Sequence, residues 1–170
     1  MGLFMYISRY DSPIGTLLLT CTDQGLTGLY MNREGSRRDE HPVFRQTTQW
    51  LDAYFRGDNP AMTVPLALKG SDFQLRVWKI LLSVPYGATR SYGSIAKEIA
   101  ESMGKEKMSA QAVGQAVGRN PVSILIPCHR VLGSNGKLTG YAGGMENKIW
   151  LLEHESRHRI GERDNALHGI

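Results

Sequence analysis

A cysteine stands beside a histidine and an arginine in the segment Ile126-Pro127-Cys128-His129-Arg130. A free thiol is mostly protonated at neutral pH, and basic or cationic neighbours favour the thiolate, which is the nucleophilic form. Pro127 lacks an amide N–H and has a fixed φ, so it suits the end of a strand or a tight turn. The segment therefore predicts a reactive cysteine. The alternative is a buried cysteine that serves as a small apolar side chain.

The chain before this cysteine predicts the elements that position it. The apolar run at residues 122–126 indicates a buried strand that ends at the cysteine. Further upstream, Ser71, Ser91 and Ser109 stand as N-caps before three segments that we predict to be helices. A short polar turn at residues 104–107 joins the second and third of these segments, which predicts a helix-turn-helix.

The third predicted helix, residues 110–118, is composed almost entirely of small side chains. A glycine costs a helix interior roughly 1 kcal/mol relative to alanine, so its two glycines need a reason. One reason is close packing against a neighbouring helix, and the other is docking in a nucleic-acid groove. The residues alone favour neither explanation.

The first third of the chain predicts a small antiparallel sheet with one helix. Turn-rich segments separate three β-like runs, at residues 6–10, 16–22 and 26–31. Helical spacing covers residues 42–56, and Gly57-Asp58-Asn59-Pro60 ends that helix. We therefore predict an α+β fold, with an N-terminal domain at residues 1–65 and a mostly helical, winged-helix-like domain at residues 66–156.

Composition excludes several classes of protein. The 170 residues are 41% hydrophobic, which is enough for a sizeable core. Cys21 and Cys128 lie far apart without CxxC spacing, so we expect neither a disulfide framework nor a metal site. No signal-peptide pattern or bilayer-length apolar run is present, so we expect a cytoplasmic protein without membrane association. The net charge of +4 is compatible with a nucleic-acid partner, although solvated loops explain it equally well.

An ordered set of motifs resembles the O6-alkylguanine-DNA alkyltransferases. The set comprises Asn120-Pro121, Pro127-Cys128-His129-Arg130, Gly140-Tyr141 and the segment WLLEHE at residues 150–155. The likeness is continuous from about Phe73 to Glu155, whereas residues 1–65 are similar only in pattern to that family's ribonuclease-H-like domain. The resemblance implies transfer of an alkyl group from O6 of guanine, and also from O4 of thymine, to the sulfur of Cys128. Each chain would act once, without a cofactor.

The resemblance assigns roles to five residues around the acceptor sulfur. Cys128 is the nucleophile and alkyl acceptor, His129 takes its proton through a water, and Glu155 orients His129. Asn120 braces the turn before the cysteine through side-chain hydrogen bonds to the backbone. Tyr92 donates a proton to the leaving base; without the resemblance, it would count as a surface tyrosine.

The resemblance also implies a site for the damaged base and a surface for DNA. A base must leave the stacked duplex before the sulfur can reach it, so the family holds the flipped base in a pocket. The matching residues are Val117, Val131, Tyr141 and Ala142. Core packing is the alternative explanation for Tyr141. The recognition helix would dock in the minor groove of double-stranded DNA that contains an alkylated base. The contacts would come from Ser109, Gln111, Ala112, Gly114 and Arg130.

One position departs from the pattern of that family. The family usually has an arginine that fills the space of the flipped base, and Gln111 stands there in this chain. A neutral amide lacks the charge and part of the stacking surface. We therefore expect weaker DNA affinity and less efficient flipping, with the chemistry at Cys128 unchanged. Lys105 and Lys107, in the polar turn, would compensate in part by contacting phosphates.

Two other classes of protein stay open. The main alternative is a non-catalytic protein that recognises alkyl lesions and flags them for other repair factors, although such proteins typically replace the cysteine. An unrelated cysteine hydrolase would also use a Cys-His pair, but a preceding helix-turn-helix fits that class poorly. We further expect a monomer with no obligate protein partner, and a mobile tail at residues 157–170.

Overall fold

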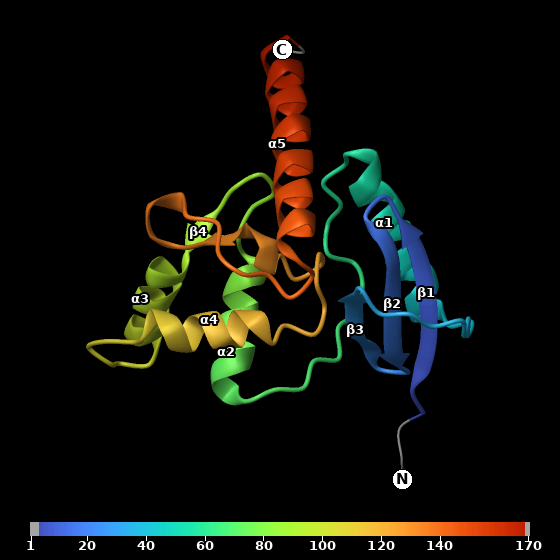
Figure 1. The fold of residues 1–170 in the computed structure, drawn as a ribbon, viewed down its shortest axis with the longest axis horizontal. Helices are drawn as coiled ribbons and strands as arrows, with labels where there is room; N and C mark the ends of the chain where they lie inside the picture. The colour runs from blue at the N-terminus through green and yellow to red at the C-terminus, as the bar shows by residue number, and fades with distance from the viewer. Residues whose placement is uncertain (1–3, 169–170) are drawn as a thin grey trace.

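The computed structural model describes the backbone of residues 4–168 and the side chains of residues 4–158. A three-stranded sheet with one helix lies beside a mostly helical part (Figure 1). A single cluster of buried apolar side chains includes residues of both parts. The predicted α+β fold is therefore confirmed.

The N-terminal sheet is an antiparallel meander of β1 (Tyr6–Ser12), β2 (Gly15–Thr22) and β3 (Gly25–Met31). Alternate residues of a strand share one face, and Leu17, Leu19 and Cys21 are accordingly buried along β2. The helix α1 (Pro42–Arg56) covers this face. Tyr10 of β1 pairs with Leu17 and so lies on the same face of the sheet. Its Oη donates to Asp52 of α1 at 2.6 Å, which places α1 over that face. The three predicted strands and the predicted helix are confirmed.

The C-terminal part is built on capped helices. The side chains of Ser71, Ser91 and Ser109 each accept a hydrogen bond from the backbone N–H three residues ahead, as predicted. The helices are α2 (Asp72–Leu82), α3 (Tyr92–Ser102), α4 (Ala110–Gly118) and α5 (Met145–His168). A short parallel pair joins β4 (Arg90–Ser91) to β5 (Val131–Leu132), and the 3-10 turns are η1 (Cys128–Arg130) and η2 (Ser134–Gly136). The segment α3–turn–α4 is the helix-turn-helix.

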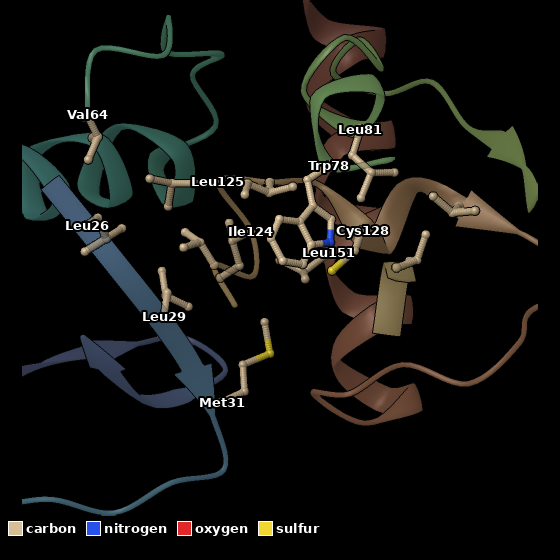
Figure 2. Close-up of a cluster of buried hydrophobic side chains, with 14 of the residues drawn as sticks. Leu26, Leu29, Met31, Val64, Trp78, Leu81, Ile124, Leu125, Cys128 and Leu151 are labelled. Carbon is tan, nitrogen blue, oxygen red and sulfur yellow. The ribbon is translucent and has the colours of Figure 1, made fainter. Parts of the chain in front are cut away.

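The predicted strand at residues 122–126 is wrong. Val122 forms one isolated bridge with Leu29, after which the chain turns, and Ile126 N–H donates back to Val122 O at 3.1 Å. Ile124 has a φ of 72°, which is rare for a β-branched residue. The run is apolar because it is buried between the two parts of the molecule: Figure 2 shows Ile124 and Leu125 facing β3. The apolar residues at 122–126 therefore indicate that the segment is buried, and they do not indicate an extended backbone.

The segments at the two predicted boundaries have definite structure. Leu26 N–H donates to Pro65 O at 2.8 Å, and Ala67 N–H donates to Leu26 O at 2.9 Å, so the linker lies along β3. The domain limits themselves stay a prediction. Residues 157–168, predicted to be a mobile tail, continue α5 as helix, and their mobility stays a prediction. Among the described residues, no helix is both long and apolar enough to cross a membrane.

Candidate active site

Cys128 is held in the first position of η1 and is only 4% exposed. Its N–H donates to Ile126 O at 2.7 Å, which fixes the turn after Pro127. The side chain belongs to the buried cluster that also contains Trp78 and Leu151 (Figure 2). Any reaction partner must therefore reach a sulfur that bulk water barely touches.

The thiol of Cys128 is protonated in the resting protein. Burial disfavours the charged form and raises the pKa of Cys128, while interactions with Asn120 and Tyr141 and the charge of Lys148 act in the opposite direction. Burial is the larger effect. The thiol therefore needs a base, as the resemblance implies, and the reactivity of Cys128 stays a prediction.

His129 has the tautomer and the charge state that such a base requires. Its Nε2 lies 2.5 Å from Oε2 of Glu155, and its buried Nδ1 has no hydrogen-bond partner among the described residues. An ionised carboxylate can only accept, so this contact assigns the proton to Nε2 and leaves a lone pair on Nδ1. Burial lowers the pKa of His129, and the charges of Arg130 and Lys148 lower it further against the opposing effect of Glu155. The imidazole is therefore neutral.

Glu155 is the centre of a buried polar network. Its carboxylate accepts hydrogen bonds from Tyr54 Oη (2.7 Å), Gly87 N (3.1 Å), His129 Nε2 (2.5 Å), Arg130 Nε (2.7 Å) and Arg130 Nη2 (3.2 Å). Burial by itself would raise the pKa of this carboxyl, but the hydrogen bonds from His129 and Arg130 and the charge of Arg130 outweigh it. The pKa of Glu155 is held well below its usual range, and the group is ionised.

Arg130 does not lie on a DNA-facing surface. The residue is 8% exposed, and its Nη1 donates to Val84 O at 2.7 Å while its other nitrogens bind Glu155. Its predicted DNA contact is wrong because the guanidinium neutralises the buried carboxylate of Glu155. A motif position next to the cysteine therefore has an electrostatic role inside the protein.

Asn120 makes both of the backbone bonds expected of a brace. Its Nδ2 donates to Ile126 O at 2.9 Å, and its Oδ1 accepts from Val122 N–H at 3.0 Å. These bonds close the irregular turn that leads from α4 to the cysteine. The side chain thus replaces the strand pairing that this segment lacks.

Lys148 is a buried residue that the sequence analysis missed. Its Nζ donates to Val131 O at 2.7 Å and to Thr139 O at 3.3 Å. Burial lowers the pKa of Lys148, whereas a negative charge on Cys128 raises it. A signal existed in the sequence, because Lys148, Leu151 and Glu155 share one face of a helix at i, i+3 and i+7.

A groove of about 640 Å³ runs beside the recognition helix α4. Tyr92, Gln111 and Gly114 line it, so three of the predicted site residues come together here. Tyr92 Oη accepts a hydrogen bond from Thr139 Oγ1 at 3.1 Å, which holds the phenol at the groove. Ser109 caps α4 through Ala112 N–H, and the contacts of these two residues with DNA stay predictions.

The two glycines of α4 are not required by tight packing. A Cβ added at Gly118 would meet no atom within 4 Å, and one at Gly114 would make ordinary contacts of 3.8 Å with Tyr92. Ala110, Gln111 and Gln115 are exposed on the same side of the helix. Of the two explanations left open by the sequence, docking of a smooth surface is the favoured one.

The four residues predicted to line a lesion pocket have different environments. Val117 and Val131 belong to the core, at 5% and 0% exposure, whereas Ala142 is exposed. Tyr141 is half-buried and lies close enough to Cys128 that burial and a negative sulfur both raise the pKa of its phenol. Its Oη has no hydrogen-bond partner within the described part of the chain. The assignment of these residues to the pocket stays a prediction.

Comparison with known proteins links both parts of the chain to one family. The models of the 6-O-methylguanine DNA methyltransferase family match as its ribonuclease-like domain at residues 5–68 and its DNA binding domain at residues 72–157. The methylated-DNA–protein-cysteine methyltransferase of Methanosarcina acetivorans is 45% identical over 160 residues, which cover 89% of this chain and 98% of the relative. The Mycolicibacterium paratuberculosis protein of the same name is 49% identical over 154 residues, covering 87% and 90%.

Solved structures show the same likeness. The crystal structure of Mycobacterium tuberculosis OGT in complex with DNA is 46% identical, with a TM-score of 0.78, and covers 90% of this chain and 94% of that one. The crystal structure of the Mycobacterium tuberculosis O6-methylguanine methyltransferase is 43% identical, also with a TM-score of 0.78, and covers 91% and 94%. The likeness therefore extends over both parts of the fold.

Proposed function

The chain belongs to the 6-O-methylguanine DNA methyltransferase family, and we infer that Cys128 is the cysteine that accepts the alkyl group. The family repairs DNA by direct transfer of an alkyl group to a protein cysteine, which is consumed in the reaction. The observation that carries the assignment is the buried pair of Glu155 and His129 beside Cys128. Cys21 lies in the sheet, where burial, aided by two aspartates, raises its pKa to about 11.

The proposed reaction begins with proton transfer from Cys128. The neutral His129 accepts the thiol proton at Nδ1 through a water, and Glu155 stabilises the imidazolium that forms. Asn120, Tyr141 and Lys148 all lower the pKa of the thiol, so they favour the buried thiolate once the proton has left. The thiolate of Cys128 therefore forms only when His129 is neutral and can accept the thiol proton.

The thiolate then attacks the alkyl carbon on O6 of the guanine. A C–S bond forms as the C–O bond breaks, and the electron pair of the C–O bond passes to the base. Tyr92, held at the groove by Thr139, donates a proton to the departing base. The thioether product has no good leaving group, so one chain removes one alkyl group. O4-alkylthymine presents the same alkyl–oxygen bond and is a second proposed substrate.

We propose that α4 carries the DNA-docking surface. The protein binds DNA through its helix-turn-helix domain, and the exposed small side chains of α4 suit close approach to a minor groove. The groove beside α4 would admit the flipped alkylated base. Every residue of the proposed relay comes from one chain, so a monomer suffices for the reaction.

The test of this function is the intact mass of the protein after reaction with a duplex that contains one O6-methylguanine. We expect a gain of about 14 Da, one methyl in place of a hydrogen, that stops at one per chain and maps to the peptide with Cys128. An undamaged duplex should give no gain. Tighter binding of the damaged duplex without any gain would instead identify a lesion-recognition protein.

Gln111 offers a gain-of-function test of the docking surface. It is exposed on α4 and lines the groove, so Gln111→Arg adds a cation that would lie near the DNA backbone and the space that the flipped base leaves. We expect tighter DNA binding at low salt, a salt dependence steeper by up to about one phosphate contact, and faster transfer. Titrations by fluorescence anisotropy at several salt concentrations measure the first two effects.

The matched control for that substitution is Gln46→Arg. Gln46 is exposed on α1, which covers the N-terminal sheet away from α4, as Figure 1 shows. Gln46→Arg adds the same charge to the protein as Gln111→Arg does. Equal gains in affinity from both variants would mean that net charge, and not the α4 surface, controls binding.

A further inference from the structure

We propose that Tyr54, which belongs to the N-terminal part of the molecule, is a positioning residue for the Glu155–His129 relay. The inference rests on the proposed function, because it takes His129 as the base that serves Cys128. It gives the N-terminal part a direct role in the chemistry of the C-terminal part. Nothing in the sequence near Tyr54 indicates such a role.

The hydroxyl of Tyr54 and the imidazole of His129 donate hydrogen bonds to the same carboxylate oxygen of Glu155. Tyr54 Oη donates to Oε2 of Glu155 at 2.7 Å, and Nε2 of His129 donates to the same oxygen. Tyr54 is fully buried, and burial together with the charge of Glu155 raises the pKa of its phenol well above the usual value. The hydroxyl therefore remains a donor throughout the range in which the protein works.

The ring of Tyr54 is itself held rigidly. Trp50 stacks on it with centroids 5.4 Å apart, and Tyr86 packs edge-on at 6.1 Å. Its backbone is tied as well, because His154 Nε2 lies 2.7 Å from Tyr54 O. His154 precedes Glu155 in α5, so Tyr54 binds two successive residues of that helix. The end of α1 consequently fixes where the carboxylate of Glu155 lies.

The hydrogen bond from Tyr54 also limits how strongly Glu155 raises the basicity of His129. A donor on Oε2 withdraws part of the negative charge that His129 would otherwise feel. Among the described residues, the ionisable groups around the imidazole are Glu155 and Lys148 of α5, Arg130 and Cys128 of η1, and, beyond these, Tyr54, Tyr86 and Tyr141. Removal of the Tyr54 hydroxyl should both loosen the carboxylate and raise the pKa of His129.

The experiment compares wild-type protein with Tyr54→Phe in single-turnover methyl transfer from an O6-methylguanine duplex between pH 5 and pH 9. Phenylalanine keeps the packed ring and removes only the hydroxyl. We expect the second-order rate constant to fall by roughly tenfold or more, as for one lost hydrogen bond to a charged group. We also expect the acid limb of the pH–rate profile, which reports protonation of His129, to move to higher pH.

Tyr10→Phe is the matched control. Tyr10 Oη also donates to a carboxylate on α1, that of Asp52 at 2.6 Å, but lies away from the relay. This variant should keep the wild-type rate and acid limb. Rates are normalised to the chains that become methylated at long times, so partial unfolding does not imitate the effect.

The outcomes separate the inference from the function on which it rests. If the wild type accepts no methyl group, the proposed function fails. If the wild type reacts and Tyr54→Phe has an unmoved acid limb, the function stands and the role of Tyr54 is refuted, even where the rate has fallen, because general loosening gives that result. A shifted limb in Tyr54→Phe, absent from Tyr10→Phe, supports the inference.

Discussion

Cys128→Ser accepts no methyl group from O6-methylguanine DNA, and this is the largest effect on activity that we expect. A serine hydroxyl has a far higher pKa than a thiol, so neutral His129 leaves it protonated, and a neutral hydroxyl is a poor nucleophile toward an alkyl carbon. Because the side chain changes by one atom, the fold should survive, although a hydroxyl at this buried position costs some stability. Intact mass against time measures the transfer, and a gel-shift titration shows that the variant still binds the duplex.

Cys21→Ser is the matched control for that variant. Both cysteines are buried, but Cys21 lies on β2 with its sulfur among apolar side chains of the sheet. Cys21→Ser should gain one methyl per folded chain, although a hydroxyl in that position costs some stability. Methylation of the Cys128→Ser chain, or its loss in folded Cys21→Ser, would place the acceptor elsewhere.

Local signals in the sequence were sufficient to predict most of the elements. Each capping serine precedes its helix by one residue in the structure, and the turn at Gly57 ends α1 in the left-handed region, with a φ of 105°. Such features depend on a few neighbouring residues and so can be read from spacing. The structure of the segment before Cys128 could not be predicted from spacing, because Ile124 adopts a positive φ that only the surrounding packing explains.

The residues of the candidate site also fall into those that the sequence predicted and those that only the folded structure brings together. Cys128 and His129 are adjacent in the sequence, and the resemblance supplied Glu155 as their third member. The prediction that Arg130 contacts DNA failed because its guanidinium binds Glu155, which lies 25 residues away in the sequence. Tyr54 lies 101 residues from the carboxylate that it binds. No periodicity reports contacts of that kind, since they exist only after the two parts of the molecule have packed together.

Glu155→Gln should impair both stability and transfer. The guanidinium of Arg130 would remain buried without a counter-charge, which costs about 3 kcal/mol of unfolding free energy. The amide of glutamine can donate to Nε2 of His129 and so favours the tautomer with its proton on Nδ1, which cannot accept the thiol proton. We expect transfer to slow by about a hundredfold or more. Urea unfolding and single-turnover kinetics measure the two effects.

The pH dependence of unfolding gives an independent check on the same substitution. The folded-state pKa of Glu155 lies below its ordinary value of 4.5, so its ionisation contributes stability that is fully present above that pH and is lost as the pH falls below it. The wild-type advantage over Glu155→Gln should therefore shrink in acid. Glu153→Gln, an exposed site on the same helix, should change stability by less than about 0.5 kcal/mol and leave the rate unaltered. If Glu155→Gln transferred methyl groups as fast as Glu153→Gln does, His129 would need no carboxylate, and the relay would have to be abandoned.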